Sequence, residues 1–126
     1  MRVIPGDQIE GLTMDYESMK ERNSSIGSGG VIVMDDTTCM VTALYHMMRF
    51  YHDESCGQCT PCREGSGWVL KMLKRIKQGK GNADLVGEIR TVASKIEGRT
   101  ICAFGEAISW PVTSFIDHFY DEFVYF

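Results

Sequence analysis

The chain contains the stretch Ser55-Cys56-Gly57-Gln58-Cys59-Thr60-Pro61-Cys62-Arg63-Glu64-Gly65, on which the interpretation of the whole sequence depends. Its cysteines are spaced C-x2-C-x2-C, so one short loop can present three thiolates to one end of a four-iron cluster. A fourth candidate lies far downstream, in Thr100-Ile101-Cys102-Ala103-Phe104-Gly105. The predicted ligands of a 4Fe-4S cluster are therefore Cys56, Cys59, Cys62 and Cys102.

The cysteines alone leave two other metal sites open. A zinc ion held by four cysteines is the first, although such sites usually consist of two separated C-x2-C pairs, which a triplet with one remote partner fits poorly. The second is a cluster with three cysteine ligands and one open iron, and Cys102 argues against it. The remaining thiol, Cys39, is expected in the first turn of a helix, packed as a small apolar residue.

Length and composition set the limits of the fold. The 126 residues suit one domain of ordinary size, and a hydrophobic fraction of 44% is enough for a small core. The net charge of −4 and the absence of a basic stripe argue against a nucleic-acid partner. No membrane span and no signal peptide are expected, because the apolar runs are short. An odd number of cysteines with this spacing favours a reducing compartment over a disulfide scaffold.

The sequence divides near residue 36. Residues 1–36 contain scattered apolar side chains, a Gly-Ser-Gly-Gly turn and one apolar run, Val31-Ile32-Val33-Met34, which is predicted to be a β-strand. A segment of this size cannot bury much core alone. It must therefore dock on residues 37–126 or be the remnant of a larger domain.

Residues 37–126 carry four amphipathic helical patterns. The predicted helices cover residues 37–52, the cysteine loop to residue 79, residues 83–97, and a stretch that follows Pro111. Residues 35–38 supply candidate N-caps for the first helix and Asn82 for the third, and Trp68 is placed on the apolar face of the second. Four helices with short links predict a mainly α fold, an antiparallel four-helix bundle.

This topology brings the cysteines together. The triplet bridges the first and second helices, and Cys102 lies between the third and fourth, so both connections fall at the same end of an antiparallel bundle. Cys62 is expected at the start of the second helix, where free backbone N–H groups stabilise thiolates. Gly57 permits a tight turn, and Arg63 is expected to offset the negative charge of a cluster.

Residues 55–65 resemble the cluster signature of the NADH-binding, flavin-carrying subunit of respiratory complex I. Thr100-Ile101-Cys102-Ala103-Phe104-Gly105-Glu106-Ala107, with Trp110-Pro111-Val112, resembles the part of that family that brings the fourth ligand. Residues 27–35 resemble the end of the ubiquitin-like domain that precedes the bundle. The resemblance extends from about Leu12 to the C-terminus, and implies that residues 1–36 are the remnant of an α+β ubiquitin-like domain before a 4Fe-4S bundle at 37–126.

The resemblance also implies a function. In that family NADH gives a hydride to FMN, and electrons then pass singly through this 4Fe-4S cluster to other iron–sulfur centres, toward quinone. The implied partners are a 2Fe-2S thioredoxin-like subunit and a large iron–sulfur subunit, at the cytoplasmic face of the plasma membrane or the matrix side in mitochondria. The family's flavin and NADH loop, of the Gly-Arg-Gly-Gly-Ala-Gly-Phe-Pro type, does not occur in this sequence. The chain is thus expected to hold the cluster but not to oxidise NADH alone.

Two alternatives to this interpretation stay open. Related subunits of NAD-linked hydrogenases and formate dehydrogenases share the cysteine signature, although the Cys-Arg-Glu-Gly form and the Trp-Pro-Val segment favour complex I. The other alternative is an interaction module in which zinc staples the bundle and the bundle docks partners.

Overall fold

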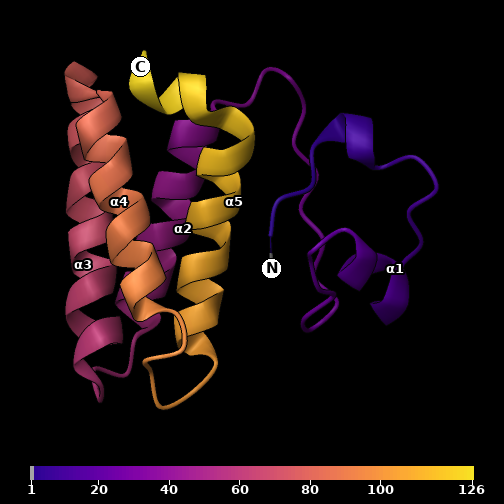
Figure 1. Cartoon of the computed structure of the whole chain (residues 1–126), viewed down its shortest axis with the longest axis horizontal. Coiled ribbons are helices and arrows are strands. Elements are labelled where there is room, and N and C mark those ends of the chain that lie inside the picture. The colour runs from indigo at the N-terminus through magenta and orange to yellow at the C-terminus, as the bar shows by residue number, and fades with distance from the viewer. Residues whose placement is uncertain (1) are drawn as a thin grey trace.

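The computed structural model describes residues 2–126. In chain order its elements are η1 (Gly6–Gln8), α1 (Tyr16–Glu21), α2 (Met40–Glu54), α3 (Thr60–Arg75), η2 (Ile76–Lys80), α4 (Ala83–Ile96) and α5 (Phe104–Val124). Helices α2 to α5 stand side by side as a bundle, and the N-terminal segment with α1 lies beside it (Figure 1). The prediction of a mainly α, four-helix bundle is confirmed.

The four long helices close into a ring. Helix α2 packs on α3 and α5, and α4 also packs on α3 and α5, as short connections between antiparallel neighbours require. Each helix contributes fully buried side chains to one core, among them Leu44, Leu73, Ile89 and Phe115. Burying one such side chain stabilises the fold by roughly 1.5–3 kcal/mol, so the apolar stripes seen in the sequence hold the bundle together.

Helix α2 begins at Met40, later than predicted, and residues 35–38 do not supply its N-cap. The Asp35 carboxylate instead accepts hydrogen bonds from the backbone N–H of Thr37 (3.1 Å) and from the hydroxyls of Thr37 and Thr38. These bonds close a turn and lower the pKa of Asp35, with the Thr37 hydroxyl as the largest cause. The N-cap is Cys39, whose Sγ accepts a hydrogen bond from the Thr42 N–H at 3.4 Å. Cys39 was predicted to lie in the first helical turn, and it lies directly before that turn.

Helix α5 begins at Phe104, seven residues before Pro111, so the prediction that this helix follows Pro111 was wrong. Pro111 lies inside the helix and is buried. Proline removes one backbone donor and usually kinks a helix interior. The first two turns form nevertheless, because they bury Ile108 and Ser109 against the bundle.

The predicted strand at residues 31–34 is not formed. Val31, Ile32 and Val33 are 60%, 71% and 88% exposed, and residues 2–126 contain no strand with which they could pair. A single extended segment has no ladder of hydrogen bonds to hold it. The N-terminal segment contacts the bundle further upstream, where the Val3 N–H donates to Ser114 Oγ at 3.0 Å and the Arg2 guanidinium lies over the Trp110 ring.

The α3–α4 connection follows the sequence pattern closely. Gly79 adopts φ = 75°, a left-handed conformation that glycine tolerates, and ends the short π-helical turn η2. Asn82 is the N-cap of α4, because its Oδ1 accepts from the Leu85 N–H at 2.8 Å. The helix break at Gly79 and the N-cap at Asn82 were both predicted, and together they turn the chain back along α3.

Replacing Asn82 with alanine tests this cap. Asn82→Ala leaves the Leu85 N–H without its side-chain acceptor, so we expect the free energy of unfolding to fall by about 1 kcal/mol in urea titrations. Asn82→Asp keeps an acceptor in place and should stay close to the unsubstituted chain. Equal loss of stability in both variants would contradict the capping role.

Candidate metal centre

The loops that carry the predicted ligands lie at the same end of the bundle. The α2–α3 loop holds Cys56 and Cys59, Cys62 follows in the first turn of α3, and the α4–α5 loop holds Cys102. Figure 1 shows both loops at the end opposite the C-terminus. All are free thiols: Cys62 is buried, Cys59 is partly buried, and Cys56 and Cys102 are exposed.

The pKa of the Cys62 thiol depends on burial and on the other cysteines. Burial is the main cause that raises the pKa of the Cys62 thiol, and a hydrogen bond with Ser55 opposes it. Charges on Cys59, Cys56 and Cys102 each raise the same pKa further. The remote Cys102 therefore lies within electrostatic reach of the triplet, as the antiparallel topology predicts.

A hydroxyl group stands at the buried end of the site. Ser55 ends α2 with an extended backbone (φ −62°, ψ 127°) that turns the chain into the cysteine loop. Its Oγ lies 3.1 Å from Cys62 Sγ and accepts a hydrogen bond from the Gly57 N–H at 3.3 Å. Gly57 has φ = 76°, so the tight turn assigned to it from the sequence is present.

Arg63 braces the cysteine loop from outside. Its guanidinium donates to the Gly57 carbonyl at 2.6 Å, to Thr60 Oγ1 at 3.4 Å and to Glu64 Oε1 at 3.1 Å. The first of these bonds ties the start of α3 back to the middle of the loop. The sequence suggested only that Arg63 balances charge, and the structure adds this holding contact.

The loop that carries Cys102 is fixed by residues far from it in sequence. Glu97, just past the end of α4, accepts hydrogen bonds from Trp110 Nε1 at 2.8 Å and from Ser109 Oγ at 3.2 Å. Next along, the Gly98 N–H donates to Glu106 Oε1 at 2.9 Å. These bonds tie the end of α4 to α5, so both ends of the Cys102 loop are held.

Glu97 was not identified from the sequence as a residue that fixes the Cys102 loop. The signal was a carboxylate at the end of an amphipathic helix, directly before a helix-terminating glycine, with an indole N–H downstream. Within the loop itself, Thr100 Oγ1 donates to the Cys102 carbonyl at 2.8 Å. That bond sets the backbone at the fourth predicted ligand.

Helices α2 and α3 are also joined by a polar contact close to the site. His52 Nδ1 lies 3.0 Å from Ser66 Oγ, and Ser66 donates to the Arg63 carbonyl at 3.3 Å. A buried hydroxyl so paired costs little to desolvate. This contact aligns the two helices at the cysteine end without involving a cysteine.

The donor set fits an iron–sulfur cluster. Four cysteine thiols form a soft donor set of the kind that selects iron–sulfur clusters or zinc. Among residues 2–126, no three His, Cys, Asp or Glu side chains are close enough to share one metal ion. A cluster of four irons spreads its thiolates more widely than one zinc ion does, because each thiolate binds a different iron.

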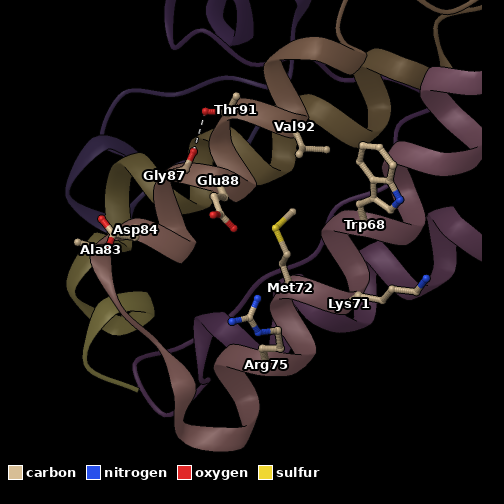
Figure 2. A pocket seen from close by; sticks show the side chains of 10 residues that line it. All are labelled: Trp68, Lys71, Met72, Arg75, Ala83, Asp84, Gly87, Glu88, Thr91 and Val92. Carbon is tan, nitrogen blue, oxygen red and sulfur yellow. Dashed lines mark hydrogen bonds between the residues drawn. The ribbon is translucent and has the colours of Figure 1, made fainter.

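A groove of about 920 Å³ lies elsewhere, along the side of α3 and α4 (Figure 2). Trp68, Met72 and Val92 line it, and Trp68, which was predicted to lie on the apolar face of its helix, is 55% exposed. Its charged lining residues are basic on α3 and acidic on α4: Lys71, Arg75, Asp84 and Glu88. It contains none of the cysteines, so it is separate from the candidate metal centre.

The structure is a small helical bundle that carries the four predicted cysteine ligands at one end. Residues 42–125 match the family described as NADH-ubiquinone oxidoreductase-F iron-sulfur binding region. The chain belongs to this family. The resemblance drawn from residues 55–65 and 100–112 is thereby confirmed, as is the prediction of a 4Fe-4S cluster as the cofactor.

Relatives of known name agree with this assignment. The chain is 42% identical over 119 residues to an F-type subunit of NADH-quinone oxidoreductase from Rhizobium meliloti (strain 1021), covering 94% of this chain and 27% of that protein. It is 40% identical over 120 residues to the F-type subunit of NADH-quinone oxidoreductase from Rhodobacter capsulatus, covering 95% of this chain and 28% of the relative. The chain thus spans little more than a quarter of the length of these curated relatives.

One solved structure shares the fold. The crystal structure of NAD⁺-reducing [NiFe]-hydrogenase in the air-oxidized state superposes with a TM-score of 0.68 at 30% identity. The similarity covers 72% of this chain and 16% of that one.

A pair of glycine substitutions tests how the Cys102 loop is held. A Cβ at Gly105 would collide with the Thr100 side chain, whereas a Cβ at Gly87 in α4 meets nothing within 4 Å. We expect Gly105→Ala to lower the free energy of unfolding by about 1–3 kcal/mol and to weaken iron binding. Gly87→Ala should raise it by roughly 0.5–1 kcal/mol, because alanine favours the helix. Urea titration and iron analysis of both variants provide the measurement, and equal iron binding by both would contradict the role given to Gly105.

Proposed function

We propose that this chain is the electron-relay module of an NADH:quinone oxidoreductase, and that Cys56, Cys59, Cys62 and Cys102 hold its single 4Fe-4S cluster. The observation that carries the proposal is that both cysteine loops lie at the same end of a bundle whose residues 42–125 match an iron–sulfur binding family, which supports a single site shared by the two loops. When bound through four thiolates, such a cluster exchanges single electrons and has no open coordination position for bond chemistry.

The residues around the site prepare it for this role. The backbone N–H groups in the first turn of α3 lack helical partners, and the partial positive charge of a helix N-terminus favours thiolates there. Arg63 holds the triplet loop, and Glu97 holds the loop of Cys102. Both thiolate groups are therefore positioned before metal arrives, which lowers the entropy lost on binding.

The wider pathway is also part of the proposal. We infer that electrons reach this module from reduced FMN, held with NADH by domains of the longer relatives, and leave to further iron–sulfur centres. Residues 1–36 would then be the tail of a ubiquitin-like domain, and residues 37–126 the cluster-binding bundle. Support comes from the curated relatives, which are subunits of NADH-quinone oxidoreductases and extend well beyond the part that this chain matches.

We propose that a 2Fe-2S thioredoxin-like subunit and a large iron–sulfur subunit are the neighbours of this chain in such a complex. A position at the inner face of the plasma membrane, or on the matrix side in mitochondria, is consistent with that proposal. Among the described residues, no helix combines the length and the apolar character that crossing a membrane requires.

A second function has one observation in its favour. The structural similarity to NAD⁺-reducing [NiFe]-hydrogenase would suit an equivalent relay in a hydrogenase. The identity to that structure is 30%, against 42% to a quinone-linked relative, so the quinone-linked function is preferred.

Alanine substitution of each cysteine tests the ligand set. Replacing Cys56, Cys59, Cys62 or Cys102 should strip or convert the cluster, because each removal leaves one iron without its thiolate. Cys39→Ala should retain four irons per chain, since Cys39 caps α2 instead of facing the site. Iron and sulfide analysis with EPR of the reduced protein measures this. A complete cluster in Cys102→Ala, together with loss in Cys39→Ala, would show that the fourth ligand was assigned wrongly.

Activity assays test whether this chain relays electrons without oxidising NADH itself. The purified chain, loaded with its cluster and supplied with FMN, should not transfer electrons from NADH to ferricyanide, because no flavin or dinucleotide loop is found in its sequence. Dithionite should still reduce its cluster. Robust NADH–ferricyanide turnover by this chain alone would overturn its description as a relay.

A further inference from the structure

Ser55 is polar, lies beside the most buried of the four cysteines, and is not a ligand in the proposed relay. Its Oγ is 3.1 Å from Cys62 Sγ, a separation at which a hydroxyl and a sulfur form a hydrogen bond. Neither Cys56 nor Cys59 has a side-chain hydrogen bond of this kind among the contacts of the described residues. Cys62 is therefore distinguished from its neighbours by a hydroxyl as well as by burial.

The direction of the bond follows from the chemistry of the two groups. A serine hydroxyl carries one proton and two acceptor lone pairs, whereas a metal-bound thiolate carries no proton. The Gly57 N–H already donates to Ser55 Oγ at 3.3 Å and occupies one of those lone pairs. Once Cys62 is a ligand, the Ser55 hydroxyl can only be the donor, and its proton points at the sulfur.

We propose that Ser55 is a positioning residue that raises the reduction potential of the cluster through the hydrogen bond from its hydroxyl to Cys62 Sγ. This inference rests on the proposed function. Reduction adds one electron and so one negative charge, which spreads onto the ligand sulfurs. A donor at the sulfur stabilises the reduced form more than the oxidised form. The hydroxyl proton stays on the Ser55 oxygen throughout, so no proton is transferred with the electron.

The surroundings strengthen the effect. Cys62 is 5% exposed, so water does not compete well for its sulfur, and electrostatic interactions weaken less there than in bulk solvent. The Ser55 backbone is fixed as the C-cap of α2, with its N–H donating to the His52 carbonyl. Its side chain is thus held from both sides, by the helix end and by Gly57.

Redox titration of the cluster-loaded full chain, followed by EPR, tests the proposal. In Ser55→Ala we expect the ratio of reduced to oxidised cluster at a fixed ambient potential to fall about tenfold, equivalent to roughly 59 mV for one electron. Ser55→Thr keeps the hydroxyl and should restore most of the potential. Ser55→Val has the shape of threonine without the hydroxyl and should behave like Ser55→Ala.

Ser66→Ala is the matched control. Ser66 is a buried hydroxyl one turn beyond Cys62 that bonds to His52 and the Arg63 carbonyl and to no cysteine. Its loss should leave the potential unchanged. An equal fall in Ser66→Ala, or in Ser55→Thr, would overturn the proposal, because the shift would then reflect packing near the site.

The remaining outcomes are also decisive. Four irons and an unchanged potential in Ser55→Ala would overturn the role of Ser55 while the proposed function stands. A second contradictory result would be loss of the cluster from both Ser55→Ala and Ser55→Val, with full loading of Ser55→Thr. The role of Ser55 in setting the potential would then be overturned, because its hydroxyl would be needed to hold the loop instead. Failure of the unsubstituted chain to bind a cluster would remove the proposed function itself, and Ser55 with it.

Discussion

The free-energy cost of gathering thiolates around a buried sulfur is the constraint on which the arrangement of this chain depends. Burial does most to raise the pKa of Cys62. The other three cysteines raise it further, because a second negative charge nearby disfavours ionisation. Metal binding must therefore displace the proton of the Cys62 thiol, whose raised pKa disfavours its loss, and the iron cations supply the compensating interaction. Until then, only the bundle keeps the two cysteine loops together.

The two cysteine loops are held in place by different kinds of contact. The triplet loop is braced locally, since Arg63 reaches back only to Gly57 and Ser55 bonds to Gly57 within the same turn. The Cys102 loop relies on contacts across elements, from Glu97 at the end of α4 to Trp110 within α5. A local brace can form as soon as α3 forms. The second loop takes shape only when α4 and α5 have packed, so the fourth ligand depends more on tertiary structure than the first three.

This difference also explains what the sequence could predict. Apolar periodicity identified the four helices, although not the first residues of α2 and α5, and Asn82 and Gly79 lie where their chemistry requires. The antiparallel order then brought the cysteine loops to one end without any knowledge of side-chain contacts. These features are encoded by residues within a few positions of one another, which is the range over which a pattern can be recognised.

The predictions failed where contacts between residues distant in sequence determine the local structure. Pro111 looks like a helix start, but the turns before it are stabilised by burial of Ile108 against other helices. Residues 31–34 have the composition of a strand, yet a strand needs a neighbour and the described part of the chain offers none. Glu97 looks like an ordinary surface acid until α5 brings an indole N–H to it. In each case the local signal was present, and the outcome depended on whether a contact distant in sequence was formed.

The position of the site at the end of the bundle suits a relay better than a buried centre would. Cys62 alone among the four predicted ligands is buried, and Cys56 and Cys102 face outward. In the proposed relay, electrons would arrive and leave through the exposed side without any movement of the helices, while hydrogen-bonded groups hold the inner side. The core of the bundle is apolar, and Leu44, Met48 and Val69 are completely excluded from solvent. In such surroundings a single donor at one sulfur has more influence on the energy of an added charge than it would at the exposed cysteines, where water already supplies hydrogen bonds.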